Sequence, residues 1–184
     1  MNKKVKEFSY NAIGPLQRVS ENGAKQIYQF EIKCCEMKDY NNIGVTKNSD
    51  FSHIFDVVTT ITGPCLYYFE IQSDHTAEEI INKVKDYKAT NASKAVPAIK
   101  KHFSKSKILY VGKVKKSLWA RLVQHLGYYN VPRTQGLQLF YWANEMNISL
   151  KMNILEFETE MADYIGILES DLAKELKPIL GRHA

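Results

Sequence analysis

Short runs of apolar residues, separated by clusters of Gly, Pro, Asn and Ser, divide most of this chain into segments whose spacing predicts secondary structure. Apolar positions alternate at 26–34, which predicts a strand with one apolar face. The compact apolar runs at 65–71 and 108–111 are typical of buried strands. Further strands are predicted at 137–142 and 148–157, so the pattern indicates five strands.

Apolar residues at intervals of three and four predict three helices among these strands. The first follows Thr76, which forms a capping-box pattern with Glu79. The second covers 118–126 and is flanked by a serine and a glycine at the positions that start and end helices. The third covers 159–176 and is stopped by Pro178, because proline cannot continue a helix.

The start of the chain is less regular than the rest. Gly14-Pro15 and Asn22-Gly23 interrupt 1–25, so a loosely ordered arm or a turn-rich lead-in is predicted there. From residue 65 onward the predicted order is strand, helix, strand, helix, strand, strand, helix. This order predicts an α/β or α+β layered domain rather than a bundle or a barrel.

Composition places the chain among single domains that fold around one core. Its 184 residues, 45% of them apolar, suffice for that core. No apolar run approaches the roughly 18 residues of a membrane span, and the odd number of cysteines provides no disulfide framework. These features predict a cytoplasmic protein with no membrane partner.

The net charge of +5 is unevenly distributed. The segment 83–125 holds twelve Lys or Arg residues and one Asp, a formal charge of +11, which leaves −6 for the rest of the chain. A chain polarised in this way attracts polyanions. The alternative is a lysine-rich face that only aids solubility, and composition does not choose between the two.

Two of the predicted strands and two of the predicted helices carry residues with chemistry in a recognisable order. Tyrosines lie in the strands at 65–71 and 108–111, and the second of these strands is followed by Gly and Lys. An Arg and a His, four residues apart, share one face of the helix after it. A Glu lies in the last helix. The set is Tyr67, Tyr110, Gly112, Arg121, His125 and Glu169.

At these residues the chain resembles the GIY-YIG nuclease superfamily. The resemblance covers about 63–181 and implies a small central, mostly antiparallel sheet flanked by helices. The core would span 63–184, with 1–62 packed on it as an N-terminal extension. The resemblance also implies that 72–107, where the family has a short hairpin, is a helical insertion. Two residues depart from the family pattern: Cys65 replaces the first glycine, and Gly181 replaces an asparagine that many members keep.

The resemblance implies a metal-dependent endonuclease that hydrolyses DNA phosphodiester bonds, of restriction or defence type. Glu169 would hold Mg²⁺ or Mn²⁺, since one carboxylate with water and phosphate oxygens suits these ions. Arg121 would stabilise the transition state, because its planar, always charged fork matches phosphate. Tyr67 or Tyr110 would take a proton from water, and His125 would relay that proton or orient its partner.

The substrate implied is double-stranded DNA, and symmetric cutting of both strands would favour a homodimer. The basic segment supplies the phosphate-binding candidates Lys100, Lys101, Lys105, Lys107, Lys113, Lys115 and Lys116.

Each of these residues also has a plainer interpretation: a core tyrosine, a solvated lysine, an exposed helical glutamate. Two other functions therefore stay open from the sequence. One is a nucleic-acid-binding protein that keeps the fold without catalysis, and the other is a protein-interaction domain.

Overall fold

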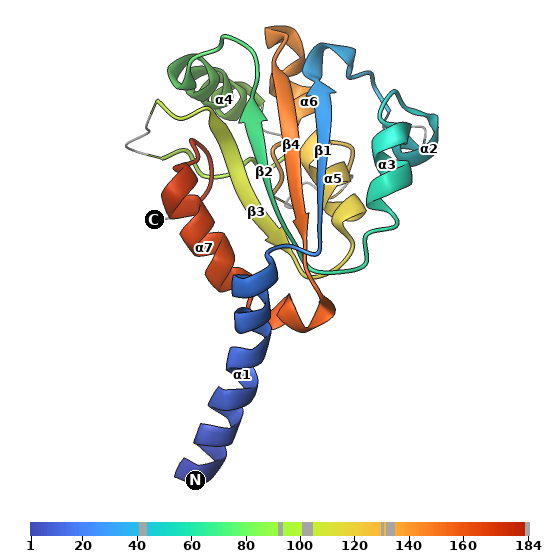
Figure 1. Ribbon diagram of the computed structural model, residues 1–184. Coiled ribbons are helices and arrows are strands. Elements are labelled where there is room, and N and C mark those ends of the chain that lie inside the picture. Colours follow the sequence, from blue (N-terminus) through green and yellow to red (C-terminus); the bar gives the residue numbers. More distant parts are fainter. Residues whose placement is uncertain (41–43, 92–93, 101–104, 130, 132–134, 183–184) are drawn as a thin grey trace.

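The computed structural model of the chain describes residues 1–40, 44–91, 94–100, 105–129, 131 and 135–182, and Figure 1 shows the arrangement of its elements. In chain order these are α1 (Asn2–Asn22), β1 (Gln26–Lys33), η1 (Cys34–Glu36), α2 (Val45–Asn48), α3 (Ser52–Val58), β2 (Cys65–Ile71), α4 (Ala77–Asn91), β3 (Ile108–Val114), α5 (Leu118–Leu126), α6 (Leu139–Trp142), η2 (Asn144–Met146), β4 (Ser149–Glu156), η3 (Thr159–Asp163) and α7 (Ile165–Leu176).

The four strands form one antiparallel sheet in the order β1-β4-β2-β3, flanked by helices on both faces. The predicted α+β fold with a small antiparallel sheet is therefore confirmed. Tyr67 of β2 lies opposite Gly112 of β3 on one side and Ile154 of β4 on the other. This register brings the two tyrosine-bearing strands into direct contact.

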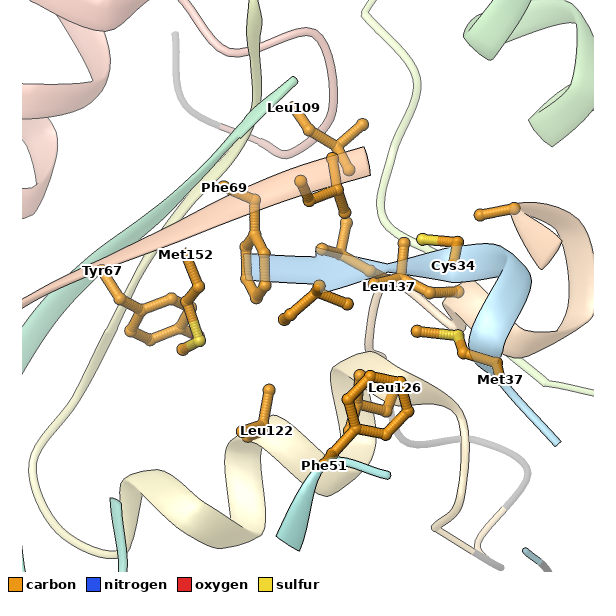
Figure 2. Packing of buried hydrophobic residues seen from close by; sticks show 14 of the residues in the cluster. Cys34, Met37, Phe51, Tyr67, Phe69, Leu109, Leu122, Leu126, Leu137 and Met152 are labelled. Carbon is orange, nitrogen blue, oxygen red and sulfur yellow. The ribbon is translucent and has the colours of Figure 1, made fainter. Parts of the chain in front are cut away.

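Each face of the sheet has its own hydrophobic cluster. The larger cluster covers the face toward α3, α5 and α6, where Tyr67 and Phe69 of β2 and Met152 of β4 point toward Leu122 of α5 (Figure 2). The smaller cluster covers the other face, where Ile165 of α7 packs with residues of η3 and α1. Two helices on opposite faces, α5 and α7, thus flank the edge strand β3.

Most of the predicted elements are present at or near their expected positions. The strand at 65–71 is β2 with the same bounds, and 26–34 and 148–157 correspond to β1 and β4. The capping box at the start of α4 forms as expected, since Thr76 and Glu79 exchange hydrogen bonds in both directions. These elements are buried or capped locally, so their own residues suffice to specify them.

The predicted loose arm at 1–25 is wrong, because 2–22 form the helix α1. Leu16 and Val19 of this helix pack on the smaller hydrophobic cluster. That burial stabilises the helical conformation even though Pro15 lies inside the helix. The Asn-Gly pair does mark a boundary: Gly23 has a φ of 74° and ends the helix with an N–H to Val19 oxygen hydrogen bond. The N-terminal half of α1 extends away from the body (Figure 1).

The predicted strand at 137–142 is also wrong, since 139–142 form the short helix α6. Here the buried Trp142 donates its indole N–H to the carbonyl of Leu137 at 2.7 Å, which requires the chain to turn back on itself. The predicted helix at 159–176 begins as the 3₁₀ segment η3, and its α-helical part starts at Ile165.

Two details near the expected second helix also differ from prediction. Ser117 occupies the N-cap position of α5 with a φ of 59°, and its side chain makes no capping hydrogen bond. β3 continues through Gly112 to Val114 rather than ending at Gly112. Gly112 is therefore an interior strand residue, so the end of the strand is not the reason for a glycine at this position.

Candidate active site

A pocket of about 200 Å³ opens at the β3 edge of the sheet, between the elements that carry the predicted site residues. Tyr110 comes from β3, Arg121 from α5 and Glu169 from α7, so three separate elements converge there. The remaining wall comes from two loops and the C-terminal segment. The full lining is Pro97, Ala98, Tyr110, Arg121, Gln135, Glu169, Gly181 and Arg182.

Gly112 allows the two tyrosine rings to meet above β3. A Cβ at this position would lie 2.6 Å from the hydroxyl of Tyr67 and 2.7 Å from the ring of Tyr110. Both distances are shorter than any ordinary contact with a methyl group, so only glycine fits. The ring centroids of the two tyrosines are 6.4 Å apart. The glycine therefore has a packing role in the site.

His125 is fully buried beneath Tyr67, and its surroundings fix its tautomer. The backbone N–H of Leu137 donates to His125 Nδ1 at 3.1 Å, so Nδ1 carries no proton. In the neutral ring the proton must then be on Nε2, which lies 2.9 Å from the Tyr67 hydroxyl oxygen. His125 therefore donates to Tyr67. Burial, followed by the nearby charge of Arg121, holds the pKa of His125 well below its usual value.

Arg121 joins both phenols through one guanidinium group. Its Nε donates to the Tyr67 hydroxyl at 3.2 Å, and Nη2 donates to the Tyr110 hydroxyl at 3.4 Å. Nη1 donates to the side chain of Gln124 and the carbonyl of Gln135, both at 2.6 Å. Burial acts to lower the pKa of Arg121, but the two phenols outweigh it and the net direction is upward.

The two tyrosines differ in access to the pocket. Tyr67 has no exposed surface, and its oxygen accepts hydrogen bonds from both His125 and Arg121. Burial raises the pKa of Tyr67 well above its usual value, although Arg121 opposes the shift. Tyr110 is half-buried and lines the pocket. Of these two phenols, only Tyr110 can reach a molecule in the pocket.

Glu169 is paired with Lys113, whose ammonium lies 2.5 Å from Glu169 Oε2. The carboxylate side chain is 12% exposed, so it faces the pocket from a mostly buried position. One carboxylate beside open space is a donor set that suits Mg²⁺, which keeps several waters when protein-bound. Among the described residues no three His, Cys, Asp or Glu side chains gather into a metal site.

The seven candidate phosphate-binding lysines have different environments. Lys107 donates to two backbone carbonyls, and Lys115 pairs with Asp163 at 2.6 Å. Lys113 pairs with the glutamate, as described above. In the part of the chain that the structure describes, no ion-pair partner is present for Lys100, Lys105 and Lys116. Lys101 lies outside the described residues.

The segment at 72–107 contributes to the site in a way that its sequence did not indicate. Its described part after α4 forms one wall of the pocket, where Ala98 accepts a hydrogen bond from the N–H of Gly181. Lys94, in the same segment, is buried and donates to the carbonyls of Gly127 and Tyr129 at 3.0 and 2.7 Å. The segment therefore ties the end of α5 to the pocket wall.

The two departures from the family pattern have local structural explanations. Cys65 is fully buried and does not line the pocket. Two residues earlier, a Cβ on Gly63 would overlap the carbonyl oxygen of Phe157, so the chain requires glycine there instead. Gly181 has a φ of 117°, which L side chains rarely adopt. A glycine is thus required where the C-terminal segment turns at the pocket.

One other hollow carries the same kinds of group, since Tyr10, Arg18, Glu21 and Glu160 line it. The groove beside α1, about 540 Å³, is bordered by Arg18 and Glu160, which already form an ion pair at 2.6 Å. None of the helices in the described ranges combines the length and apolar character needed to cross a membrane.

Comparison of the chain with protein-family models, with curated proteins and with solved structures finds no match. The resemblance to GIY-YIG nucleases thus stays a prediction carried by the motif residues. Any function has to be argued from the geometry of the pocket itself.

Proposed function

We propose that this protein is a Mg²⁺-dependent endonuclease that hydrolyses phosphodiester bonds in double-stranded DNA. The observation that carries this proposal is the convergence of Tyr110, Arg121 and Glu169 on one small pocket from β3, α5 and α7. Together they offer a phenol as a base for water, a guanidinium to balance the phosphate charge and a carboxylate to hold a metal ion, a set that suits phosphodiester hydrolysis.

Within the pocket the protein's own groups have separate roles. Tyr110, in its phenolate form, would take the proton from the attacking water and become the neutral phenol, because it is the tyrosine that reaches the pocket. Arg121 holds positive charge beside both phenols and beside the phosphate oxygens, which favours the charge that develops in the transition state. Glu169 would hold the metal ion. A bound Mg²⁺ supplies charge neutralisation at the departing oxygen.

Tyr67 and His125 support this arrangement from below. The His125 Nε2–H and the Arg121 Nε–H both point at the Tyr67 oxygen, so these three groups hold one another in place. His125 acts in this scheme as an orienting donor and does not accept a proton, since its Nδ1 is occupied by the Leu137 N–H. Of the two roles considered for His125 from the sequence, we therefore propose orientation.

A polyanionic substrate is supported by the charge around the pocket. The segment 83–125, which carries +11, includes β3 and the start of α5, the elements that supply Tyr110 and Arg121. Lys116 adds an exposed ammonium just before α5. Such a field attracts a nucleic-acid backbone and raises its local concentration.

Incubation of the purified protein with supercoiled plasmid in the presence of Mg²⁺ tests the proposal. We expect nicked and linear products from the parent protein and at least a 100-fold lower rate from Glu169→Ala and Arg121→Ala, about the loss seen when one group stabilising the transition state is removed. Lys47→Ala, on α2 at the opposite side of the molecule (Figure 1), is the matched control. Equal cutting by all four proteins would contradict the proposed site.

A second candidate function is DNA binding without cleavage. It is favoured by the Lys113 to Glu169 ion pair, which already neutralises the carboxylate that a metal would need. This candidate predicts plasmid binding by the parent protein with no cutting in Mg²⁺ or Mn²⁺. The same plasmid assay, with a gel-shift measurement beside it, distinguishes the two.

A further inference from the structure

The guanidinium of Arg121 is largely committed to other protein groups. Four of its five N–H donors are used, by Tyr67, Tyr110, Gln124 and the carbonyl of Gln135. A bidentate contact with phosphate needs two donors on one edge of the fork. Arg121 therefore cannot bind a backbone phosphate in this way without giving up at least one of these four contacts.

A second arginine lines the same pocket and is not committed. Arg182 is exposed at the pocket rim, and the described residues give it neither a hydrogen bond nor an ion pair. Its charge beside the pocket is thus available to an anion that enters from solvent.

The backbone before Arg182 is firmly held against the pocket. The N–H groups of Ile179 and Leu180 donate to the carbonyls of Ile108 and Leu109 in the β3 strand region, at 2.9 and 3.0 Å. The N–H of Gly181 then donates to Ala98 at 2.9 Å, and its φ of 117° turns the chain there. Three backbone hydrogen bonds therefore place residue 182 beside Tyr110 and Glu169, although it is far from them in the sequence.

We infer that Arg182 binds the DNA phosphate next to the one that is cleaved, so that the pocket uses two arginines with different tasks. Arg121 acts on the phenols and the reacting phosphate from the inner wall, whereas Arg182 holds the neighbouring phosphate at the rim. This inference rests on the proposed function. A guanidinium that contacts a non-reacting phosphate binds substrate and transition state equally, so it lowers KM and leaves kcat unchanged.

Steady-state cleavage of plasmid with Mg²⁺ by the parent, Arg182→Ala, Arg182→Lys and Lys47→Ala proteins tests this inference. For Arg182→Ala we expect KM to rise about tenfold with kcat within about twofold of the parent, while Arg182→Lys lies between them because it keeps the charge without the fork. Lys47→Ala should match the parent. All four proteins should unfold at the same temperature, because Arg182 is exposed.

Binding measured by fluorescence anisotropy, with a labelled 20-base-pair duplex and EDTA, provides a second readout. Loss of one phosphate contact should lower the slope of log affinity against log salt concentration by about one for Arg182→Ala. If the parent cuts DNA and Arg182→Ala has the same KM and the same salt dependence as the parent, the assignment of Arg182 is overturned and the proposed function is not. A parent that neither binds nor cuts DNA overturns the proposed function and this inference together.

Discussion

Lowering the pH should destabilise the folded protein through His125. Its ring is fully buried, its Nδ1 accepts the Leu137 N–H, and its pKa lies well below the usual value of about 6.5. Below pH 6.5 the unfolded chain therefore takes up a proton that the folded chain does not. The free energy of unfolding must then fall as the pH falls, and the full contribution of neutral His125 is present only above about pH 6.5.

The size of the effect follows from the unfolded-state pKa alone, as long as the folded ring stays neutral. At pH 5.5 an unperturbed histidine is about ten parts protonated to one part neutral, which stabilises the unfolded state by about 1.4 kcal/mol. At pH 7.5 the same quantity is below about 0.1 kcal/mol. His125 alone should thus account for a loss of about 1.3 kcal/mol between these two pH values.

Urea unfolding of the parent and His125→Gln proteins at pH 7.5 and 5.5 measures this contribution. Other titrating groups are common to both proteins, so the parent should lose about 1.3 kcal/mol more than the variant. Long-range ¹H–¹⁵N NMR of the parent adds a test that does not depend on how the variant folds. It should show the His125 proton on Nε2, with no protonation down to pH 5.5. Equal pH dependence in the two proteins, or a proton on Nδ1, would refute the reasoning.

Four further substitutions separate the roles within the site. Gly112→Ala should destabilise the fold by about 1–3 kcal/mol in urea unfolding and suppress plasmid cleavage, because its Cβ would meet both tyrosine rings; an active, stable variant would contradict the packing role. Lys94→Met should cost about 1–3 kcal/mol, since two carbonyls after α5 lose their donor, and an unchanged unfolding midpoint would contradict this. Tyr67→Phe should destabilise the fold by about 2–4 kcal/mol, because the N–H donors of His125 and Arg121 lose their acceptor. Tyr110→Phe should mainly lower kcat. If Tyr110→Phe instead destabilised the fold and Tyr67→Phe only lowered kcat, the roles assigned to the two tyrosines would be wrong.

The candidate site was predictable where the residues of a strand or helix are enough to specify that element. The pairing of the strands then follows from the elements themselves. The strands with Tyr67 and Tyr110 are short and strongly apolar, and Arg121 with His125 lies on a helix of clear periodicity. Once such elements exist, an antiparallel pairing of the two strands brings their tyrosines together. The motif residues therefore converge in the structure as their order along the chain led us to expect.

Prediction failed where burial against a distant part of the chain decides the local conformation. The α1 helix forms through its packing on a cluster that includes Phe157, Met161 and Ile165, more than 130 positions away, and this packing outweighs the Gly14-Pro15 signal. The run at 137–142 is too short for its period to separate strand from helix, and the indole of Trp142 settles the choice. The first contact is distant in the sequence, whereas the second lies within the run itself and depends on the burial of Trp142 in the core.

The remaining parts of the site depend on loops and on the C-terminus. Lys94 and Arg182 carry no motif, and in the sequence each is one basic residue among many. Their difference is entirely positional: one is buried against two carbonyls, and the other is exposed at the pocket rim.

The sequence by itself determined the class of fold, most of the strands, and a set of motif residues that folding brings together around one pocket. The tertiary structure decided which phenol reaches the pocket, which nitrogen of His125 carries its proton, and which arginine has donors to spare. The physical reason is that periodicity depends on neighbours along the chain, whereas burial and hydrogen-bond partners depend on groups that only folding brings together.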